Sequence, residues 1–243
     1  MITTSNGTFE IDYDDCYIRN HMMTGQVFEH HIINGILKKY VEKCKYIVDV
    51  GANIGCHAIS YAGFSPQSNI WAFEPQKKLS SILSRNVELN GYSNRLRVYN
   101  MGLGHTKMKT QLRSISDVRD ADHNGWNKAG LGIGKNGETI EITTLDSFEL
   151  PGLDFMKIDV EGAEGLVIMG AEETIKKYKP IVFFEHNYMR VNPEDVDLEQ
   201  IPTPFEILAK LGYKTFLYTD WDNFLAFPED LVKENEKGEI KIQ

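Results

Sequence analysis

Residues 49–55 (DVGANIG) combine an acidic residue, two glycines and an asparagine directly after an apolar run. Gly51 permits a tight turn, and Gly55 lets a following helix start close to the preceding strand. We expect exposed backbone N–H groups of such a turn, at the start of a helix, to face a bound ligand. The segment therefore predicts a cofactor site at the end of a first strand.

Acidic or polar residues follow four of the apolar runs that we interpret as parallel strands. They are Asp49, Glu74, Asp159 and the pair Glu185 and His186. The carboxyl ends of parallel strands meet at one edge of a sheet, so we expect these side chains to share a ligand site. The alternative is that each acid only caps the helix that follows its strand.

The glycine spacing separates two classes of nucleoside cofactor. A dinucleotide-binding turn reads G-x-G-x-x-G, whereas Asn53 stands at the middle position here and the spacing differs. Asp49 would repel a pyrophosphate and attract an ammonium or a sulfonium group. Glu74 can accept two hydrogen bonds from ribose hydroxyls. These residues favour S-adenosylmethionine over NAD. The alternatives are a nicotinamide-dependent oxidoreductase and a non-catalytic module that kept the fold.

Four sequence blocks resemble one known family. They are residues 48–55 (VDVGANIG), 73–75 (FEP), 144–146 (TLD) and, most specifically, 157–164 (KIDVEGAE). In this order the chain resembles the FkbM-type methyltransferases. The resemblance implies a class I methyltransferase (Rossmann-like) α/β fold: a seven-stranded, mostly parallel sheet with a late antiparallel strand and helices on both faces. It also implies S-adenosylmethionine-dependent O-methylation of a small molecule. We favour a sugar or glycan hydroxyl as the acceptor, with a polyketide or other metabolite as the alternative.

The same resemblance implies the cofactor contacts. Glu74 would bind the ribose, and Met101 and Gly102, after the third strand, would lie beside the adenine. Glu29 stands where the family often has an acid before its first strand. The methionine part would be held by the turn, at Asp49, Gly51, Ala52, Asn53 and Gly55.

Methyl transfer to an alcohol oxygen is an in-line displacement, in which positioning contributes most of the rate. A base that accepts the hydroxyl proton helps further, and His186 is the first candidate because a histidine titrates near neutral pH. Asp159, Glu161 and Glu185 could orient His186 or act as the base themselves. The alternatives are a structural role for His186, a cofactor role for Asp159 and a capping role for Glu161. These residues are also hard ligands for a divalent metal, which is possible but not expected.

The elements that must position these residues alternate as strand and helix from about Tyr46 onward, which predicts parallel βαβ units. Pro75 suits the first turn of the second helix, and the helix after the fourth strand is expected to run to about Lys177. We expect strands at residues 46–50, 70–73, 96–99, 153–158 and 181–184, and late strands at about 213–218 and 224–227.

Two further segments complete a single methyltransferase domain over residues 1–243. Alternating polar and apolar residues around a glycine-rich stretch predict a β-rich insertion at about 107–145. Residues 1–45 are expected to form a helical N-terminal cap before the core at 46–243.

The composition is that of a globular protein with an acidic surface. The chain has 243 residues and a formal net charge of −9, which disfavours a nucleic-acid partner. Three cysteines lack metal-binding spacing, and the N-terminus lacks a signal-peptide layout. No apolar run approaches the roughly 18 residues of a membrane span. We therefore expect a cytoplasmic protein that acts on a small molecule or glycan.

Overall fold

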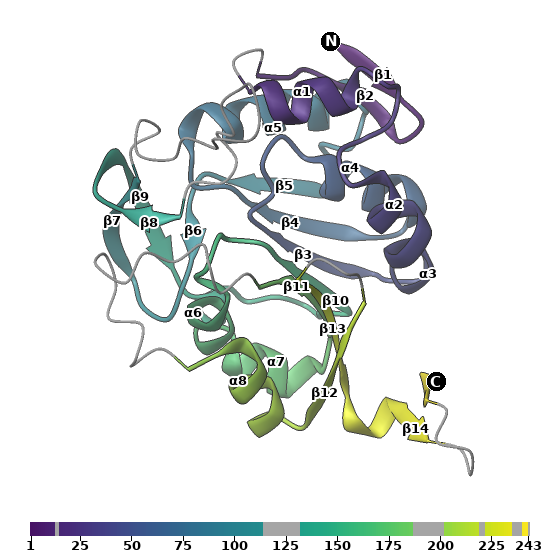
Figure 1. Ribbon diagram of the computed structural model, residues 1–243, viewed down its shortest axis with the longest axis vertical. Helices are drawn as coiled ribbons and strands as arrows, with labels where there is room; N and C mark the ends of the chain where they lie inside the picture. The colour runs from purple at the N-terminus through teal and green to yellow at the C-terminus, as the bar shows by residue number, and fades with distance from the viewer. Residues whose placement is uncertain (13–14, 114–131, 187–201, 219–221, 235–239, 243) are drawn as a thin grey trace.

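The computed structural model describes residues 1–12, 15–113, 132–186, 202–218, 222–234 and 240–242. Its central strands are β3 (Tyr46–Val50), β4 (Asn69–Phe73), β5 (Leu96–Tyr99), β10 (Phe155–Ile158), β11 (Ile181–Glu185), β12 (Tyr213–Leu217) and β13 (Asn223–Pro228). They form a seven-stranded sheet in the order β12-β13-β11-β10-β3-β4-β5 (Figure 1). Neighbours from β11 to β5 are parallel, and β13 is antiparallel to both β11 and β12. The predicted mostly parallel sheet is confirmed.

Helices cover both faces of this sheet, and each face has its own apolar core. Successive strand residues point to opposite faces, so Ile47 and Val48 enter different cores. One core lies beneath the N-terminal segment, α4 (Cys56–Phe64) and α5 (Lys77–Leu89). The other lies beneath α6 (Glu164–Met169), α7 (Glu172–Tyr178) and α8 (Pro204–Lys210). Strands buried on both faces account for the continuous apolar runs in the sequence.

The N-terminal segment differs from the predicted helical cap. It opens with a β-hairpin, β1 (Ile2–Thr4) and β2 (Gly7–Phe9), before the helical elements. These are α1 (Cys16–Met22), α2 (His30–Ile32), the π-helix η1 (Ile33–Leu37) and α3 (Lys38–Val41). The hairpin pairs with α5 through side chains: the Asn90 side chain accepts from the Thr8 N–H and donates to the Thr8 carbonyl. A local helical pattern carries no signal for such long-range pairing.

The helix after β10 is interrupted, whereas we predicted one helix to about Lys177. It breaks between α6 and α7 at Gly170, where a Cβ atom would lie 1.8 Å from the Gly104 carbonyl oxygen. The Gly170 carbonyl accepts from the Asp146 N–H, and the Asp146 carboxylate accepts from the N–H groups of Glu173 and Thr174. Asp146 therefore ends one helix and starts the next.

Pro75 also lies outside its predicted position in the first helical turn. The residue at the N-cap of α5 is Gln76, so Pro75 precedes the helix. The Glu74 carboxylate accepts the Gln76 N–H at 2.8 Å. This hydrogen bond draws the chain into a turn before the helix begins.

The predicted β-rich insertion is present and begins slightly earlier than expected. It is a four-stranded sheet of β6 (Gly102–Leu103), β7 (Met108–Arg113), β8 (Ile133–Gly134) and β9 (Asn136–Thr143), in the order β6-β9-β7-β8. Its loop at 114–131 lies outside the described residues. The short helices η2 (Leu145–Ser147) and η4 (Glu229–Leu231) and the hairpin of β14 (Val232–Glu234) and β15 (Ile240–Ile242) complete the described elements.

Within these described ranges, no helix combines the length and the apolar character that a membrane crossing requires.

Asn86 on α5 provides a test of how the N-terminal segment is attached. Its buried amide accepts from the Glu10 N–H at 2.6 Å and donates to the carbonyls of Glu10 and Ile54 at 2.9 Å each. Asn86→Ala removes all three hydrogen bonds and leaves their backbone partners unpaired. We therefore expect a loss of about 2–4 kcal/mol in the free energy of unfolding, measured in urea. The exposed Glu88→Ala on the same helix should change it by less than about 0.5 kcal/mol. Equal effects of the two variants would contradict this attachment.

Candidate active site

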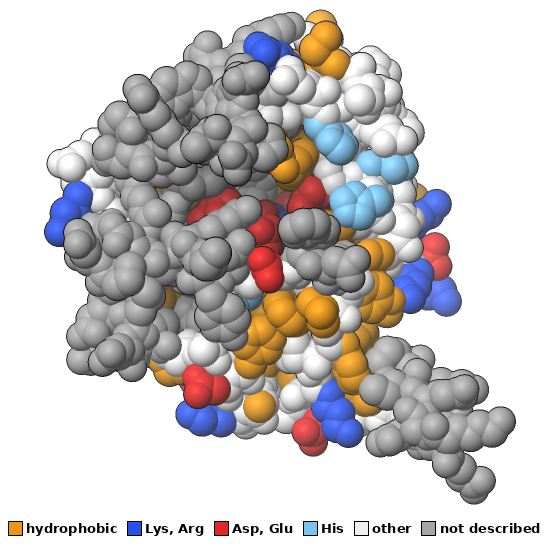
Figure 2. All heavy atoms as spheres, in the orientation of Figure 1, with side chains coloured by type: hydrophobic (Ala, Val, Ile, Leu, Met, Phe, Trp, Pro, Cys, Tyr) orange, Lys and Arg blue, Asp and Glu red, His pale blue; other side chains and the backbone are white. Residues whose placement is uncertain are grey.

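A cavity of about 480 Å³ opens at the carboxyl ends of β3, β4 and β10, where ligands bind in open parallel sheets. Figure 2 shows one face of the molecule, with acidic side chains gathered near its middle and histidines beside them. Most of the predicted site residues line the cavity: Glu29, Gly51, Ala52, Asn53, Glu74, Gly102, Asp159, Glu161 and Glu185. Asp49, Gly55, Met101 and His186 do not belong to the cavity wall among the described residues.

The backbone N–H groups of the turn do not face the cavity as we expected. Those of Gly51 and Ala52 both donate to the Phe73 carbonyl at 3.0 Å. The Asn53 N–H donates to the Glu74 carboxylate at 2.9 Å. The next two N–H groups are also used, by the Asn53 side chain and the Ala52 carbonyl. The turn is thus tied to the end of β4 and keeps no N–H group for a phosphate.

Asp49 lies behind the cavity and is paired with Lys157, a residue that the sequence analysis missed. The two residues are direct neighbours in the β3–β10 register, so their side chains emerge on the same face of the sheet. Lys157 Nζ lies 3.4 Å from Asp49 Oδ1, and both side chains are almost completely buried. The only sequence signal was a charged residue in the middle of an apolar strand.

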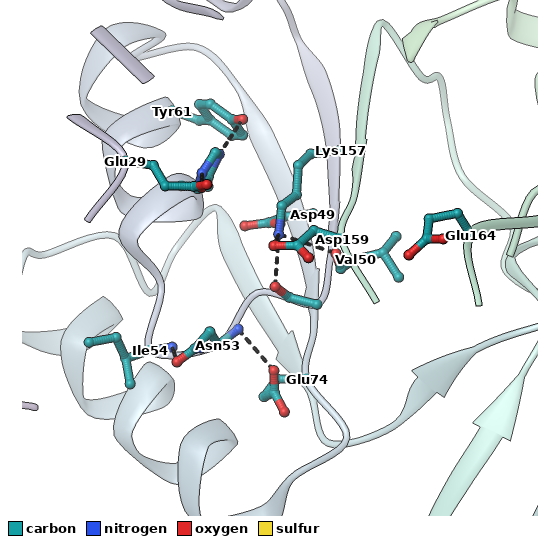
Figure 3. A network of polar contacts seen from close by, with 12 residues as sticks. Glu29, Asp49, Val50, Asn53, Ile54, Tyr61, Glu74, Lys157, Asp159 and Glu164 are labelled. Atoms are coloured by element: carbon teal, nitrogen blue, oxygen red, sulfur yellow. Dashed lines mark hydrogen bonds and ion pairs between the residues drawn. The ribbon is translucent and has the colours of Figure 1, made fainter. Parts of the chain in front are cut away.

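The Lys157 ammonium also connects the turn to the cavity (Figure 3). It donates to the Gly51 carbonyl at 2.8 Å and lies 3.4 Å from the Asp159 carboxylate. Burial alone would lower the pKa of Lys157, but the nearby charges of Asp49, Asp159 and Glu29 outweigh burial and raise it. Lys157 therefore stays charged and compensates the two aspartates.

Asp159 reaches the cavity from the end of β10, with 27% of its side chain exposed. Desolvation raises its pKa above the usual range, although the Lys157 ammonium acts in the opposite direction. A carboxylate with a raised pKa, at the wall of a cavity, has the properties of a general base.

Glu74 is buried where the turn meets the end of β4 (Figure 3). Its two carboxylate oxygens accept one backbone N–H each, from Gln76 at 2.8 Å and Asn53 at 2.9 Å. A carboxylate offers about four acceptor positions, so each oxygen keeps one for a ligand hydroxyl. Burial raises the pKa of Glu74 to about 7 despite these two hydrogen bonds.

The insertion supplies an apolar cavity wall that the sequence analysis did not predict. Leu112, Ile140 and Ile142 form a small separate core, and all three line the cavity beside Gly102 and Leu103. A Cβ atom on Gly102 would lie 2.7 Å from Ile142 Cδ1, so the wall packs closely against this glycine. Met101 instead lines a neighbouring cavity of about 450 Å³ together with Phe148.

Three cavity residues other than glycine adopt the left-handed backbone conformation. They are Glu29, Asn53 and Glu161, with φ of 57°, 51° and 57°. This conformation is uncommon outside glycine and is typically kept where it positions a functional group. Glu161 and Gly162 form the turn after β10, and the Glu164 carboxylate accepts the Gly162 N–H at 2.9 Å.

His186 and Glu185, adjacent in sequence at the end of β11, occupy different surroundings. Glu185 lines the cavity, whereas His186 is buried beside α6. His186 Nδ1 lies 3.1 Å from the Glu164 carboxylate, and its ring packs edge-to-face on Phe205. This placement matches the structural alternative for His186.

No metal cluster is apparent in the described part of the chain, and the two thiols described there are buried. There, no group of three or more His, Cys, Asp or Glu side chains is arranged to hold a metal ion. Cys44 and Cys56 are buried free thiols, and burial raises the pKa of each to about 12.

Comparisons with known proteins agree with this geometry. A model of the Methyltransferase FkbM domain matches residues 49–218. Methyltransferase 1 of Beauveria bassiana (strain ARSEF 2860) is 28% identical over 163 residues, which cover 55% of this chain and 65% of that protein. The 2-O-methyltransferase NoeI of Sinorhizobium fredii (strain NBRC 101917 / NGR234) is 24% identical over 185 residues, covering 68% and 73%. The crystal structure of Methyltransferase FkbM from Methylobacillus flagellatus KT superposes with a TM-score of 0.51 at 20% identity, covering 75% and 43%.

The sheet order and the cavity at its carboxyl edge define a class I methyltransferase fold. Because the domain match spans most of the chain, the protein belongs to the FkbM methyltransferase family. The resemblance inferred from the sequence blocks is confirmed. The matched region spans 65% of the Beauveria protein and 43% of the Methylobacillus chain.

The Lys157–Asp49 pair can be tested by a double-mutant cycle. Lys157→Met leaves Asp49 buried without its charge partner, so we expect a loss of about 3–5 kcal/mol in the free energy of unfolding. Adding Asp49→Asn removes that charge, and the double variant should be more stable than Lys157→Met alone by at least about 1 kcal/mol. Urea unfolding of the wild type, both single variants and the double variant measures the coupling. Additive losses would contradict it.

Proposed function

We propose that this protein is an S-adenosylmethionine-dependent O-methyltransferase. One observation carries the choice of cofactor: the turn has no free N–H group for a pyrophosphate, while Glu74 keeps two acceptor positions for ribose hydroxyls. A dinucleotide site uses such N–H groups to bind phosphate. The arrangement therefore fits a nucleoside without phosphates and disfavours the nicotinamide alternative.

The proposed contacts follow the length of the cavity. Glu74 binds the ribose, and Gly102 and Leu103 with the insertion wall pack on the adenine. The turn at Gly51, Ala52 and Asn53 contacts the methionine part. Asp49 contributes indirectly, because it pairs with Lys157, which binds the Gly51 carbonyl. When bound, S-adenosylmethionine supplies a methyl group activated on a sulfonium. The protein contributes position, an apolar enclosure and a carboxylate for the acceptor proton.

Asp159 is our proposed general base. It lines the cavity, desolvation raises its pKa, and Lys157 fixes its orientation. Glu185 and Glu161, which were predicted to orient His186 or to act as the base, line the same cavity, and we propose that they bind the acceptor. His186 contacts Glu164 instead of the cavity, so we assign it a structural role.

A hydroxyl on a sugar or glycan is the acceptor we favour. The carboxylates of Asp159, Glu161 and Glu185 can accept hydrogen bonds from several hydroxyls of one ligand. The NoeI relative is named a 2-O-methyltransferase, which supports transfer to oxygen. A methyl-transfer screen over glycosides, polyols and polyketide alcohols tests the acceptor class. The release of S-adenosylhomocysteine measures the reaction with each compound.

Calorimetry tests the cofactor through Glu74. We expect S-adenosylhomocysteine to bind and NADH not to bind. Hydroxyl donors favour the ionised Glu74, whose pKa in the free protein is about 7. Affinity should therefore be constant above that pH and fall below it, up to the 10- to 100-fold that loss of the carboxylate charge costs. Glu74→Gln should weaken binding about 10- to 100-fold at pH 8 and remove this pH dependence. Binding of NADH alone would exclude the proposed cofactor.

Two variants separate the candidate bases once the screen has provided an acceptor. Asp159→Asn should lower kcat about 10²- to 10⁴-fold, because the hydroxyl proton loses its acceptor. His186→Asn keeps a side-chain donor near Glu164, and we expect its kcat to stay close to that of the wild type. Initial rates of S-adenosylhomocysteine formation at saturating cofactor measure both. The reverse pattern would restore His186 as the base.

A further inference from the structure

A chain of three side chains runs from the cavity wall into the protein interior: Glu29 and His57 line the cavity, and Tyr61 lies behind them (Figure 3). Glu29 Oε2 is 2.8 Å from His57 Nε2, and His57 Nδ1 is 2.8 Å from the Tyr61 hydroxyl. His57 and Tyr61 are both buried and stand four residues apart on α4. The His57 ring stacks on Phe183 at 6.4 Å with an interplanar angle of 18°, so its plane is fixed.

The charges order the protons along this chain. Burial would raise the pKa of Glu29, but the hydrogen bond and charge of His57, together with Lys157, outweigh burial and lower it. Glu29 is thus ionised and accepts from His57 Nε2–H. Burial raises the pKa of Tyr61 well above its usual value, so Tyr61 keeps its proton, and its hydroxyl can donate to His57 Nδ1. When Tyr61 donates to Nδ1, the imidazole carries its proton on Nε2 and donates it to Glu29.

The second carboxylate oxygen of Glu29 has no hydrogen-bond partner in the described part of the chain, and Glu29 lines the cavity. The Glu29 backbone is held in the left-handed conformation at the start of α2. An ionised carboxylate with one oxygen bound from behind and the other toward a cavity is suited to receive a cation. S-adenosylmethionine carries such a cation, the ammonium of its amino-acid end.

We propose that His57 and Tyr61 are positioning residues that hold Glu29 to bind the ammonium of the cofactor's amino-acid end. This inference rests on the proposed cofactor and adds two residues outside the turn to its recognition. His57 donates to Glu29 Oε2, and Tyr61 keeps His57 in the donating tautomer. Loss of either residue removes a contact that holds the Glu29 carboxylate in place, so Glu29 can rotate away from the cavity.

Two ligands that differ only beyond the sulfur test the assignment. S-adenosylhomocysteine contains the amino-acid end, and 5′-methylthioadenosine has a methyl group in its place. Glu29→Gln should weaken S-adenosylhomocysteine binding about 10- to 100-fold and leave methylthioadenosine binding unchanged, as measured by calorimetry. A general disturbance of the fold would weaken both ligands together.

Isosteric variants of His57 isolate the relay. His57→Gln keeps an N–H donor near Nε2 and should retain most of the S-adenosylhomocysteine affinity. His57→Asn keeps a polar group near the Nδ1 position, toward Tyr61, and loses the donor to Glu29. It should therefore weaken the binding of S-adenosylhomocysteine and leave methylthioadenosine binding unchanged, as Glu29→Gln does. Tyr61→Phe should show the same selectivity with a smaller loss. The control Tyr178→Phe removes a phenol that donates to the Leu150 carbonyl on the other face of the sheet, and it should change neither affinity.

The outcomes separate this proposal from the proposed function. A wild-type protein that binds neither ligand would overturn the cofactor itself. A wild-type protein that binds both, with His57→Asn and Tyr61→Phe weakening both equally or neither, would overturn the positioning role alone. Should His57→Asn fail to fold, Tyr61→Phe still decides between these results.

Discussion

The buried ammonium of Lys157 is the interaction on which the rest of the site depends. β10 pairs in register with β3, which places Lys157 directly beside Asp49. From there it reaches the Gly51 carbonyl and the Asp159 carboxylate. A single positive charge thus compensates two acids and joins the cofactor end of the cavity to the proposed acceptor end. Without it, a pair of aspartates at adjacent strand ends would face a large desolvation cost.

The cofactor turn contributes shape more than hydrogen bonds. Its N–H groups donate to Phe73 and Glu74 at the end of β4, to the Asn53 side chain and to the Ala52 carbonyl, so the backbone is fixed before any ligand arrives. A Cβ atom on Gly51 would lie 1.8 Å from the Asp159 carbonyl oxygen, which shows how closely the turn and the end of β10 approach. Glycine here is a requirement of that contact as well as of a positive φ.

Strand periodicity predicted the parallel strands, and the acids at their ends predicted the edge that carries the cavity, while the seven-stranded sheet with its late antiparallel strand was implied by the family resemblance. Glu74, Asp159 and Glu185 meet there because parallel strands must end on the same side. The role of Lys157 was not readable, since it follows from the pairing of strands far apart in sequence. The insertion wall also required knowledge of how Ile140 and Ile142 fold back on Gly102. His57 and Tyr61, four residues apart on one helix, carried a local signal that could have been found.

The N-terminal hairpin adds no strand to the central sheet, and its attachment has a consequence for dynamics. Asn86 and Asn90 bind it through side-chain amides, which imitate the edge of a strand. Release of the hairpin breaks these hydrogen bonds and the packing of Phe9 in the core that it shares with the sheet, but it breaks no strand pairing of the central sheet. Amide protons of β2 should exchange with solvent through partial opening, while those of β3 and β10 exchange only through global unfolding. Glu29 follows this hairpin in the same N-terminal segment, so the cavity wall that it forms depends on that segment staying docked.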